Sequence, residues 1–224
     1  MQQPDIAGFT STFASHGALT ITNLLPEELA ASAEQELESL NWVLQVKDYS
    51  QTSRLEIPVA DIPNRDNLVS VLYDRKHDID LDNLFYIRLA VAQEELVSPG
   101  LQQMVGFLNS PNFVQTCAQI VQMPDLTHTW LEATCYDKAC FLANHRDDHH
   151  PDNRVALVLN LTRTWKLDWG GLLLLENQPD APPLIVPPHW NSLSLFRIPV
   201  NHTVTPVSQA ASERRYSITG WLRS

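Results

Sequence analysis

Hydrophobic positions along the chain follow two different periods. In the first half, apolar residues recur every three to four positions from Leu29 to Leu40, which predicts an amphipathic helix. Pro26 suits the first turn of that helix because its missing N–H would have no partner there. Helical spacing and short apolar runs also predict the other elements of this half. The predicted helices lie at 26–40, 100–108 and 110–123, and the predicted strands lie at 17–25, 41–46 and 85–91.

From about Thr127 the pattern changes to short apolar stretches separated by turn residues. The predicted strands lie at 128–137, 154–160, 171–176, 191–197, 202–207 and 214–222. Many short strands with frequent turns indicate a closed or two-sheet β architecture. We therefore predict an α+β fold: a double-stranded β-helix (jelly-roll) core with an N-terminal helical layer.

The chain shows no internal repeat and no linker of flexible composition. We predict one domain over residues 1–224. Its helix-rich part, 1–126, is expected to pack on the barrel, and residues 127–224 are expected to form the jelly-roll core with the site described below.

Composition narrows the classes of function. The net charge is −11, which argues against nucleic-acid and anionic-membrane partners because both attract positive charge. The three cysteines have no framework spacing, so a disulfide-stapled secreted domain is not expected. No signal peptide is visible and no apolar run approaches the roughly 20 residues of a membrane helix. These features predict a cytoplasmic protein, and its oligomeric state is left open.

Side chains able to bind a metal gather in residues 144–150, directly after an apolar stretch. Alternation along an extended chain points His145 and Asp147 to one face. His202, at the start of a later predicted strand, offers a third ligand. Two histidines and one carboxylate are the ligand set of non-haem Fe(II) oxygenases. A zinc site of His145, Asp147 and His149 is a rival, and each histidine taken alone has an ordinary structural explanation.

Two arginines, Arg214 and Arg215, begin the last predicted strand. A cation on a core strand is costly unless an anion meets it. Because side chains alternate, only one of the two can point inward, and periodicity does not say which one. The inward arginine would suit a carboxylate through its forked donors.

At this point an ordered series of blocks resembles the 2-oxoglutarate and Fe(II)-dependent oxygenases, most closely their prolyl-hydroxylase-like branch. The resemblance covers roughly residues 128–223. Its blocks are His145-x-Asp147, the strand 155–162, Asp168-Trp-Gly-Gly-Leu172, Pro188 with 191–196, His202-Thr-Val-Thr-Pro-Val207 and Arg215-Tyr-Ser-Ile-Thr-Gly-Trp221.

The resemblance implies a role for each matching position. His145, Asp147 and His202 would be the metal ligands, and Arg215 would bind the far carboxylate of 2-oxoglutarate. Tyr136 matches a tyrosine that often contacts this cosubstrate. Val158 departs from the pattern, because prolyl hydroxylases often have a tyrosine there. Thr205 or another hydroxyl then replaces it, or the pocket is more apolar.

The implied activity is a dioxygenase that hydroxylates an unactivated C–H and releases succinate and CO2. Fe(II) would be the cofactor and 2-oxoglutarate the cosubstrate, with ascorbate as an optional reductant and no catalytic residue beyond their ligands. The substrate would be a prolyl residue of a peptide or protein, a free amino acid or another small metabolite. Residues 41–84, which hold many charges, are the expected substrate lid. The alternatives are a zinc-dependent hydrolase and a non-catalytic β-barrel binding module.

Overall fold

A computed structural model describes residues 5–50, 54–62, 68–74, 77–148, 150–177 and 181–224. Its α-helices are α1 (Ile6–His16), α2 (Glu27–Glu38), α3 (Leu68–Asp74), α4 (Pro99–Leu108) and α5 (Pro111–Val121). Its strands are β1 (Ala18–Thr22), β2 (Val43–Asp48), β3 (Leu55–Pro58), β4 (Leu84–Ala92), β5 (His128–Tyr136), β6 (Phe141–His145), β7 (Asn153–Asn160), β8 (Leu173–Glu176), β9 (Leu184–Val186), β10 (Ser192–Arg197), β11 (Asn201–Val204) and β12 (Arg215–Arg223).

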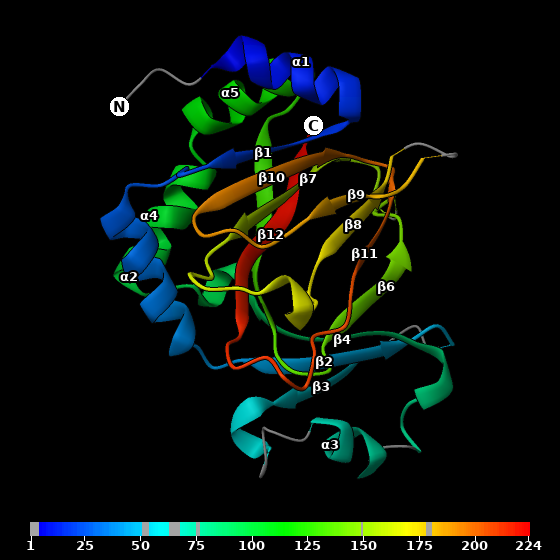
Figure 1. Ribbon diagram of the computed structural model, residues 1–224. Helices are drawn as coiled ribbons and strands as arrows, with labels where there is room; N and C mark the ends of the chain where they lie inside the picture. Colours follow the sequence, from blue (N-terminus) through cyan, green and yellow to red (C-terminus); the bar gives the residue numbers. More distant parts are fainter. Residues whose placement is uncertain (1–4, 51–53, 63–67, 75–76, 149, 178–180) are drawn as a thin grey trace.

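The strands pair in the order β1-β10-β7-β12-β5-β4-β6-β11-β8-β9, with β2 and β3 attached at β4. Neighbouring strands are antiparallel, and the sheet curls so that β6, β11 and β8 face β7 and β12 across the interior (Figure 1). The predicted jelly-roll core is confirmed. Its order mixes early and late strands, and this brings residues far apart in the chain to one cavity.

Helices α1, α2, α4 and α5 lie together on one side of the sheet (Figure 1), as the predicted helical layer requires. Two helices of this layer are joined through a side chain of α2, whose carboxylate caps the start of α4. Glu36 of α2 accepts hydrogen bonds from the backbone N–H groups of Gly100 (2.9 Å) and Leu101 (2.8 Å) at the start of α4. These N–H groups have no partner within their own helix, so the contact stabilises α4 and the packing of the two helices.

Several elements were not predicted. Helix α1 is capped at its start by Asp5, whose carboxylate accepts from the N–H of Gly8, and at its end by Gly17 in the left-handed conformation (φ 66°). Strands β3 and β9 are short, so their alternation is too brief to recognise. In the segment expected as a lid, β2 and β3 form part of the sheet, and residues 51–53, 63–67 and 75–76 lie outside the described residues.

Strand β12 runs between β5 and β7 and pairs with both along most of its length. Gly220 allows its closest approach to β5, because a Cβ there would lie 1.8 Å from the carbonyl oxygen of Trp130. Side chains that face the cavity become more exposed along the strand, from buried Arg215 to half-buried Trp221 and Arg223.

Among the described residues, no helix is long and apolar enough to span a membrane.

Candidate active site

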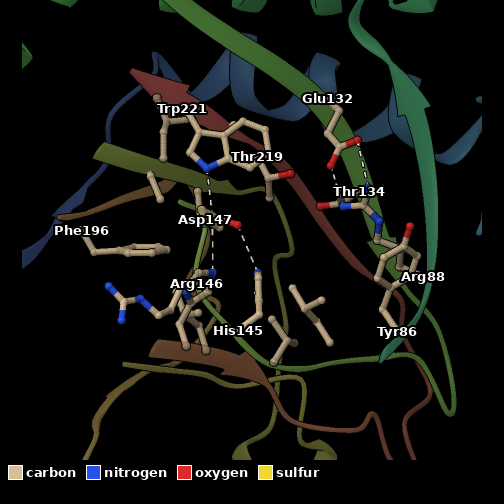
Figure 2. Close-up of a pocket in the computed structure, with 18 of the residues that line it drawn as sticks. Tyr86, Arg88, Glu132, Thr134, His145, Arg146, Asp147, Phe196, Thr219 and Trp221 are labelled. Atoms are coloured by element: carbon tan, nitrogen blue, oxygen red, sulfur yellow. Dashed lines mark hydrogen bonds and ion pairs between the residues drawn. The ribbon is translucent and has the colours of Figure 1, made fainter. Parts of the chain in front are cut away.

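A cavity of about 720 Å³ lies inside the curled sheet, within the size range of small-molecule sites. It is lined by side chains from β4, β5, β6, β7, β11 and β12. Figure 2 shows two polar groups in it, one around Asp147 and one formed by Glu132 and Arg88. The two groups come from different parts of the sheet, so the fold rather than any local motif assembles them.

His145, Asp147 and His202 meet at one side of this cavity. β6 and β11 are paired so that His202 lies opposite His145, and Asp147 follows two residues after His145. The Nε2 atom of His145 lies 3.2 Å from Oδ1 of Asp147, and that of His202 lies 3.5 Å from Oδ2. Ligand atoms of the three residues all lie within 4.8 Å of one another. This is the arrangement expected of three ligands to one ion.

The hydrogen bonds of the two histidines test whether a cation fits. Nδ1 of His145 lies 3.0 Å from the carbonyl oxygen of Ala143, and Nδ1 of His202 lies 3.0 Å from that of Val200. A carbonyl only accepts, so each Nδ1 carries the hydrogen. A neutral ring then has a lone pair at Nε2, directed at a carboxylate that also bears lone pairs. A divalent cation among these atoms removes that repulsion, and such backbone partners are usual for metal-binding histidines.

Asp147 is held in place by two further residues, one at its carboxylate and one at its backbone carbonyl. The indole Nε1–H of Trp221 donates to Oδ2 at 2.8 Å, which Figure 2 shows as a dashed line. The side-chain amide of Asn153 donates to the Asp147 carbonyl at 3.3 Å. Burial raises the pKa of this carboxyl, but hydrogen bonds that His145 and His202 can donate when Nε2 carries a proton in the metal-free protein outweigh burial and hold the pKa well below its usual range. The group is therefore ionised and oriented.

Arg215 lies in the interior of the cavity and is 2% exposed. One guanidinium nitrogen, Nη2, donates to Asn160 at 3.4 Å. The buried Nε and Nη1 have no hydrogen-bond partner within the described residues, although a buried charge left unpaired is costly. Burial lowers the pKa of Arg215. The arginine therefore offers a preformed binding site for a carboxylate.

Tyr136 lies opposite Arg215 in the pairing of β5 and β12. The Arg215 guanidinium carbon lies 5.2 Å from the centre of the Tyr136 ring, and both side chains line the cavity. Burial raises the pKa of Tyr136 to about 12, so its hydroxyl stays protonated at neutral pH and can donate to an anion.

Other residues singled out from the sequence have different surroundings. Thr205 is not among the cavity-lining residues, and its hydroxyl accepts from the N–H of Leu172 at 3.0 Å. Val158 does line the cavity, so that position presents an apolar surface. The rival ligand His149 lies outside the described residues, and the adjacent His150 lines the cavity outside the three-residue cluster.

Sequence reasoning missed Trp221, Asn153 and the ion pair of Arg88 with Glu132. The guanidinium of Arg88 contacts both carboxylate oxygens of Glu132, at 2.5 and 3.2 Å. It also donates from Nε and Nη2 to the side-chain oxygen of Gln45, at 3.2 and 3.1 Å. Alternation could have found Trp221, because it lies six residues after Arg215 on the same strand face. The partners of Arg88 depend on strand pairing and carry no comparable signal.

A family model described as the 2OG-Fe(II) oxygenase superfamily matches residues 131–223. This match includes all three members of the metal cluster and Arg215. Residues 131–223 therefore belong to this superfamily. The protein is accordingly a dioxygenase that uses Fe(II) and 2-oxoglutarate. Neither a zinc hydrolase nor a non-catalytic binding module is favoured.

Solved structures share the fold of this oxygenase at low sequence identity. A Pseudomonas putida prolyl-4-hydroxylase is 19% identical, with 97% of this chain and 98% of that chain covered and a TM-score of 0.63. A Trichoplax adhaerens prolyl hydroxylase, in complex with a hypoxia inducible factor oxygen degradation domain peptide fragment, is 15% identical (97% and 88% covered, TM-score 0.67). The non-heme alpha ketoglutarate dependent epimerase SnoN from nogalamycin biosynthesis is 11% identical (98% and 83% covered, TM-score 0.61). No curated protein sequence matches the chain.

Proposed function

We propose that His145, Asp147 and His202 bind the Fe(II) of this dioxygenase, and that the enzyme hydroxylates an unactivated C–H of a prolyl residue, a free amino acid or a small metabolite. The observation that carries the ligand assignment is the pair of Nδ1–H groups bonded to backbone carbonyls, which leaves both Nε2 atoms facing Asp147. When bound, iron and 2-oxoglutarate supply the oxidation: one oxygen atom of O2 enters succinate, CO2 is released, and the other atom enters the C–H bond.

The protein's own groups bind, orient and exclude water. Arg215 fixes the far carboxylate of 2-oxoglutarate by charge-assisted hydrogen bonds in a dry part of the cavity. Tyr136 lies beside that position and can donate its hydroxyl proton in a hydrogen bond. Thr205, already bonded to the backbone, is not part of this proposal, and Val158 provides apolar contact instead of a hydroxyl.

The prolyl-hydroxylase neighbours support prolyl or related amino-acid substrates for this chain. A neighbour named as an epimerase has the same fold, so the product must be identified by mass as well as by succinate. We propose a cytoplasmic location as well, which the three buried, unpaired cysteines support.

Metal binding and turnover test the ligand assignment. Anaerobic protein with Fe(II) and 2-oxoglutarate should show a visible charge-transfer band and, once oxygen is admitted, form succinate. The substitution His202→Ala should abolish both signals, whereas His16→Ala, at an exposed position at the end of α1, should leave them unchanged. Wild-type-like succinate formation by His202→Ala would overturn the assignment.

The substrate class is tested by a screen of succinate release across prolyl peptides, free amino acids and small acids. A product heavier by one oxygen atom supports hydroxylation. A product of unchanged mass, formed with stoichiometric succinate, would contradict it.

A further inference from the structure

Positive charge is concentrated in the cavity although the chain is acidic overall. The described lining residues include six of the chain's 15 Lys and Arg residues but two of its 26 Asp and Glu residues, Glu132 and Asp147. The six cations are Lys47, Arg54, Arg88, Arg146, Arg215 and Arg223. A cavity with this excess, in a chain of net charge −11, raises the local concentration of anions.

Two of these cations already have an assigned partner. Arg88 is paired with Glu132, and Arg215 is proposed above to bind 2-oxoglutarate. Asp147 belongs to the metal site. The remaining four cations therefore face no other carboxylate among the described residues that line the cavity.

Two of those four have acidic partners outside the cavity. Arg54 contacts Glu56 at 2.6 Å and Arg146 contacts Asp148 at 3.3 Å. All four side chains are about half exposed, and exposed ion pairs of this kind are weak. The stronger candidates for binding a ligand are therefore Lys47 and Arg223.

Lys47 and Arg223 contact aromatic rings, and neither has an acidic partner within the described part of the chain. The ammonium of Lys47 lies 5.9 Å from the centre of the Phe85 ring. The guanidinium of Arg223 lies 5.6 Å from the ring of Trp130 and 5.8 Å from that of Trp221, and its Nε donates to Asn153 at 2.9 Å. Both side chains are half-buried, so each is held in place while donors remain available.

The same rings connect these cations to the metal cluster. Phe85 makes an edge contact with His145, with ring centres 5.5 Å apart, and Trp221 donates its hydrogen bond to Asp147. Lys47 and Arg223 therefore each lie one aromatic side chain away from a residue of the metal cluster. An anionic group bound by either cation would place the rest of its molecule beside the metal cluster.

We propose that the substrate of this enzyme is an organic acid or acidic peptide, whose carboxylate binds one of the two half-buried cations of the cavity, Lys47 or Arg223. The inference rests on the proposed function, since it assigns the substrate of that same site. The aromatic rings beneath the two cations would contact the apolar part of the substrate.

Paired compounds that differ only in charge test the proposal. We would compare N-acetylproline with N-acetylprolinamide, and blocked Glu-Pro with blocked Gln-Pro, by calorimetry on anaerobic protein with Fe(II) and 2-oxoglutarate. In at least one pair the acid should bind about tenfold more tightly, as expected for hydrogen bonds to a charged group, and this advantage should shrink in high salt. A preference in the first pair identifies a small acid and in the second an acidic peptide. Affinities equal within twofold in both pairs overturn the proposal.

Matched variants locate the effect. The advantage of the acid should fall below about threefold in Lys47→Gln or in Arg223→Gln, because the substitution of the cation that binds the carboxylate removes a charge-assisted contact. Lys166→Gln is the control: Lys166 also lies over a ring, 5.1 Å from that of Trp169, but is exposed and does not line the cavity. An advantage retained in both cavity variants contradicts the proposal. The charge-transfer band of the wild-type protein reports on the proposed function separately, because it needs no substrate.

Discussion

Two arginines face the cavity from the strands on either side of β5, and their surroundings are opposite. Arg88 on β4 has both oxygens of Glu132 and the side-chain oxygen of Gln45 as acceptors. Arg215 on β12 has one long bond to Asn160, and two of its nitrogens have no partner within the described residues. Burial favours the neutral form of both side chains. The charge of Glu132 outweighs burial and raises the pKa of Arg88, whereas the pKa of Arg215 is lowered.

The comparison distinguishes a structural arginine from a ligand-binding one. The fold can supply a carboxylate to a buried guanidinium, as it does for Arg88, so the lack of one at Arg215 is a specific property of that position. A buried cation without its own anion makes folding less favourable, and an external dicarboxylate recovers that cost on binding.

The largest effect is expected from Arg215→Met. The affinity for 2-oxoglutarate should fall at least about 100-fold, because charge-assisted hydrogen bonds are lost. The free energy of unfolding without ligand should stay equal or rise, since an unpaired buried charge has been removed. Titration with 2-oxoglutarate and thermal unfolding with and without it measure the two effects. Retained affinity, or a clear loss of stability in the ligand-free protein, would contradict the comparison.

The substitution Glu132→Gln would give Arg88 the kind of surroundings that Arg215 has. We expect the free energy of unfolding to fall by about 2 kcal/mol, as for other charged groups left without their partner. Urea unfolding measures it. Asp125→Asn is the matched control, because Asp125 pairs with Arg154 at a half-exposed position and should contribute at most about 1 kcal/mol. Equal losses in the two variants would show that burial of the Arg88 pair adds nothing.

A smaller effect is expected at the metal site from Trp221→Phe. The phenyl ring keeps an aromatic side chain at this position but removes the hydrogen bond to Asp147. Metal affinity should therefore fall about tenfold, as for other residues that orient metal ligands. Metal titration of the ligand-free protein measures this without turnover. Trp130→Phe is the control, because Trp130 packs on Trp221 with ring centres 5.0 Å apart but is not bonded to Asp147. Equal metal affinities of the two variants would show that the hydrogen bond from Trp221 does not orient Asp147 for metal binding.

The smallest effect is expected from Arg214→Gln, next to Arg215 in the chain. Arg214 contacts Asp137 at 2.7 Å and is part-buried away from the cavity. The loss in unfolding free energy should be at most about 1 kcal/mol, and the affinity for 2-oxoglutarate should not change. A tenfold loss of that affinity would mean that Arg214 and Arg215 both contribute to binding of 2-oxoglutarate.

The strands of the second half could be predicted because each is a short apolar run between turns. The predicted stretches 128–137, 154–160 and 191–197 agree closely with β5, β7 and β10. Helix α1 was missed although Ile6, Phe9 and Phe13 have helical spacing, because the positions between Phe9 and Phe13 are Thr and Ser, which are weak helix formers. The jelly-roll core followed from the number and spacing of strands, which are local properties.

The candidate site was less accessible from the sequence. Alternation joins His145 with Asp147, but the pairing that places His202 opposite His145 forms only in the folded sheet. Alternation also leaves Arg214 and Arg215 equivalent until the contact with Asp137 is known. Thr205 had the right chemistry, but the turn at Gly170 and Gly171 brings the Leu172 N–H to its hydroxyl. Each of these facts depends on contacts distant in the chain.

Strand β12 carries the arginine proposed to bind 2-oxoglutarate, the tryptophan that bonds to Asp147 and a third cavity-lining side chain, at residues 215, 221 and 223. All three positions have the same parity, and successive residues on one face lie about 6.6 Å apart. Deleting one residue between them would turn every later side chain to the opposite face. In homologues, we therefore expect residue types along this strand to vary while its length does not, so that insertions and deletions fall in the loops before residue 215.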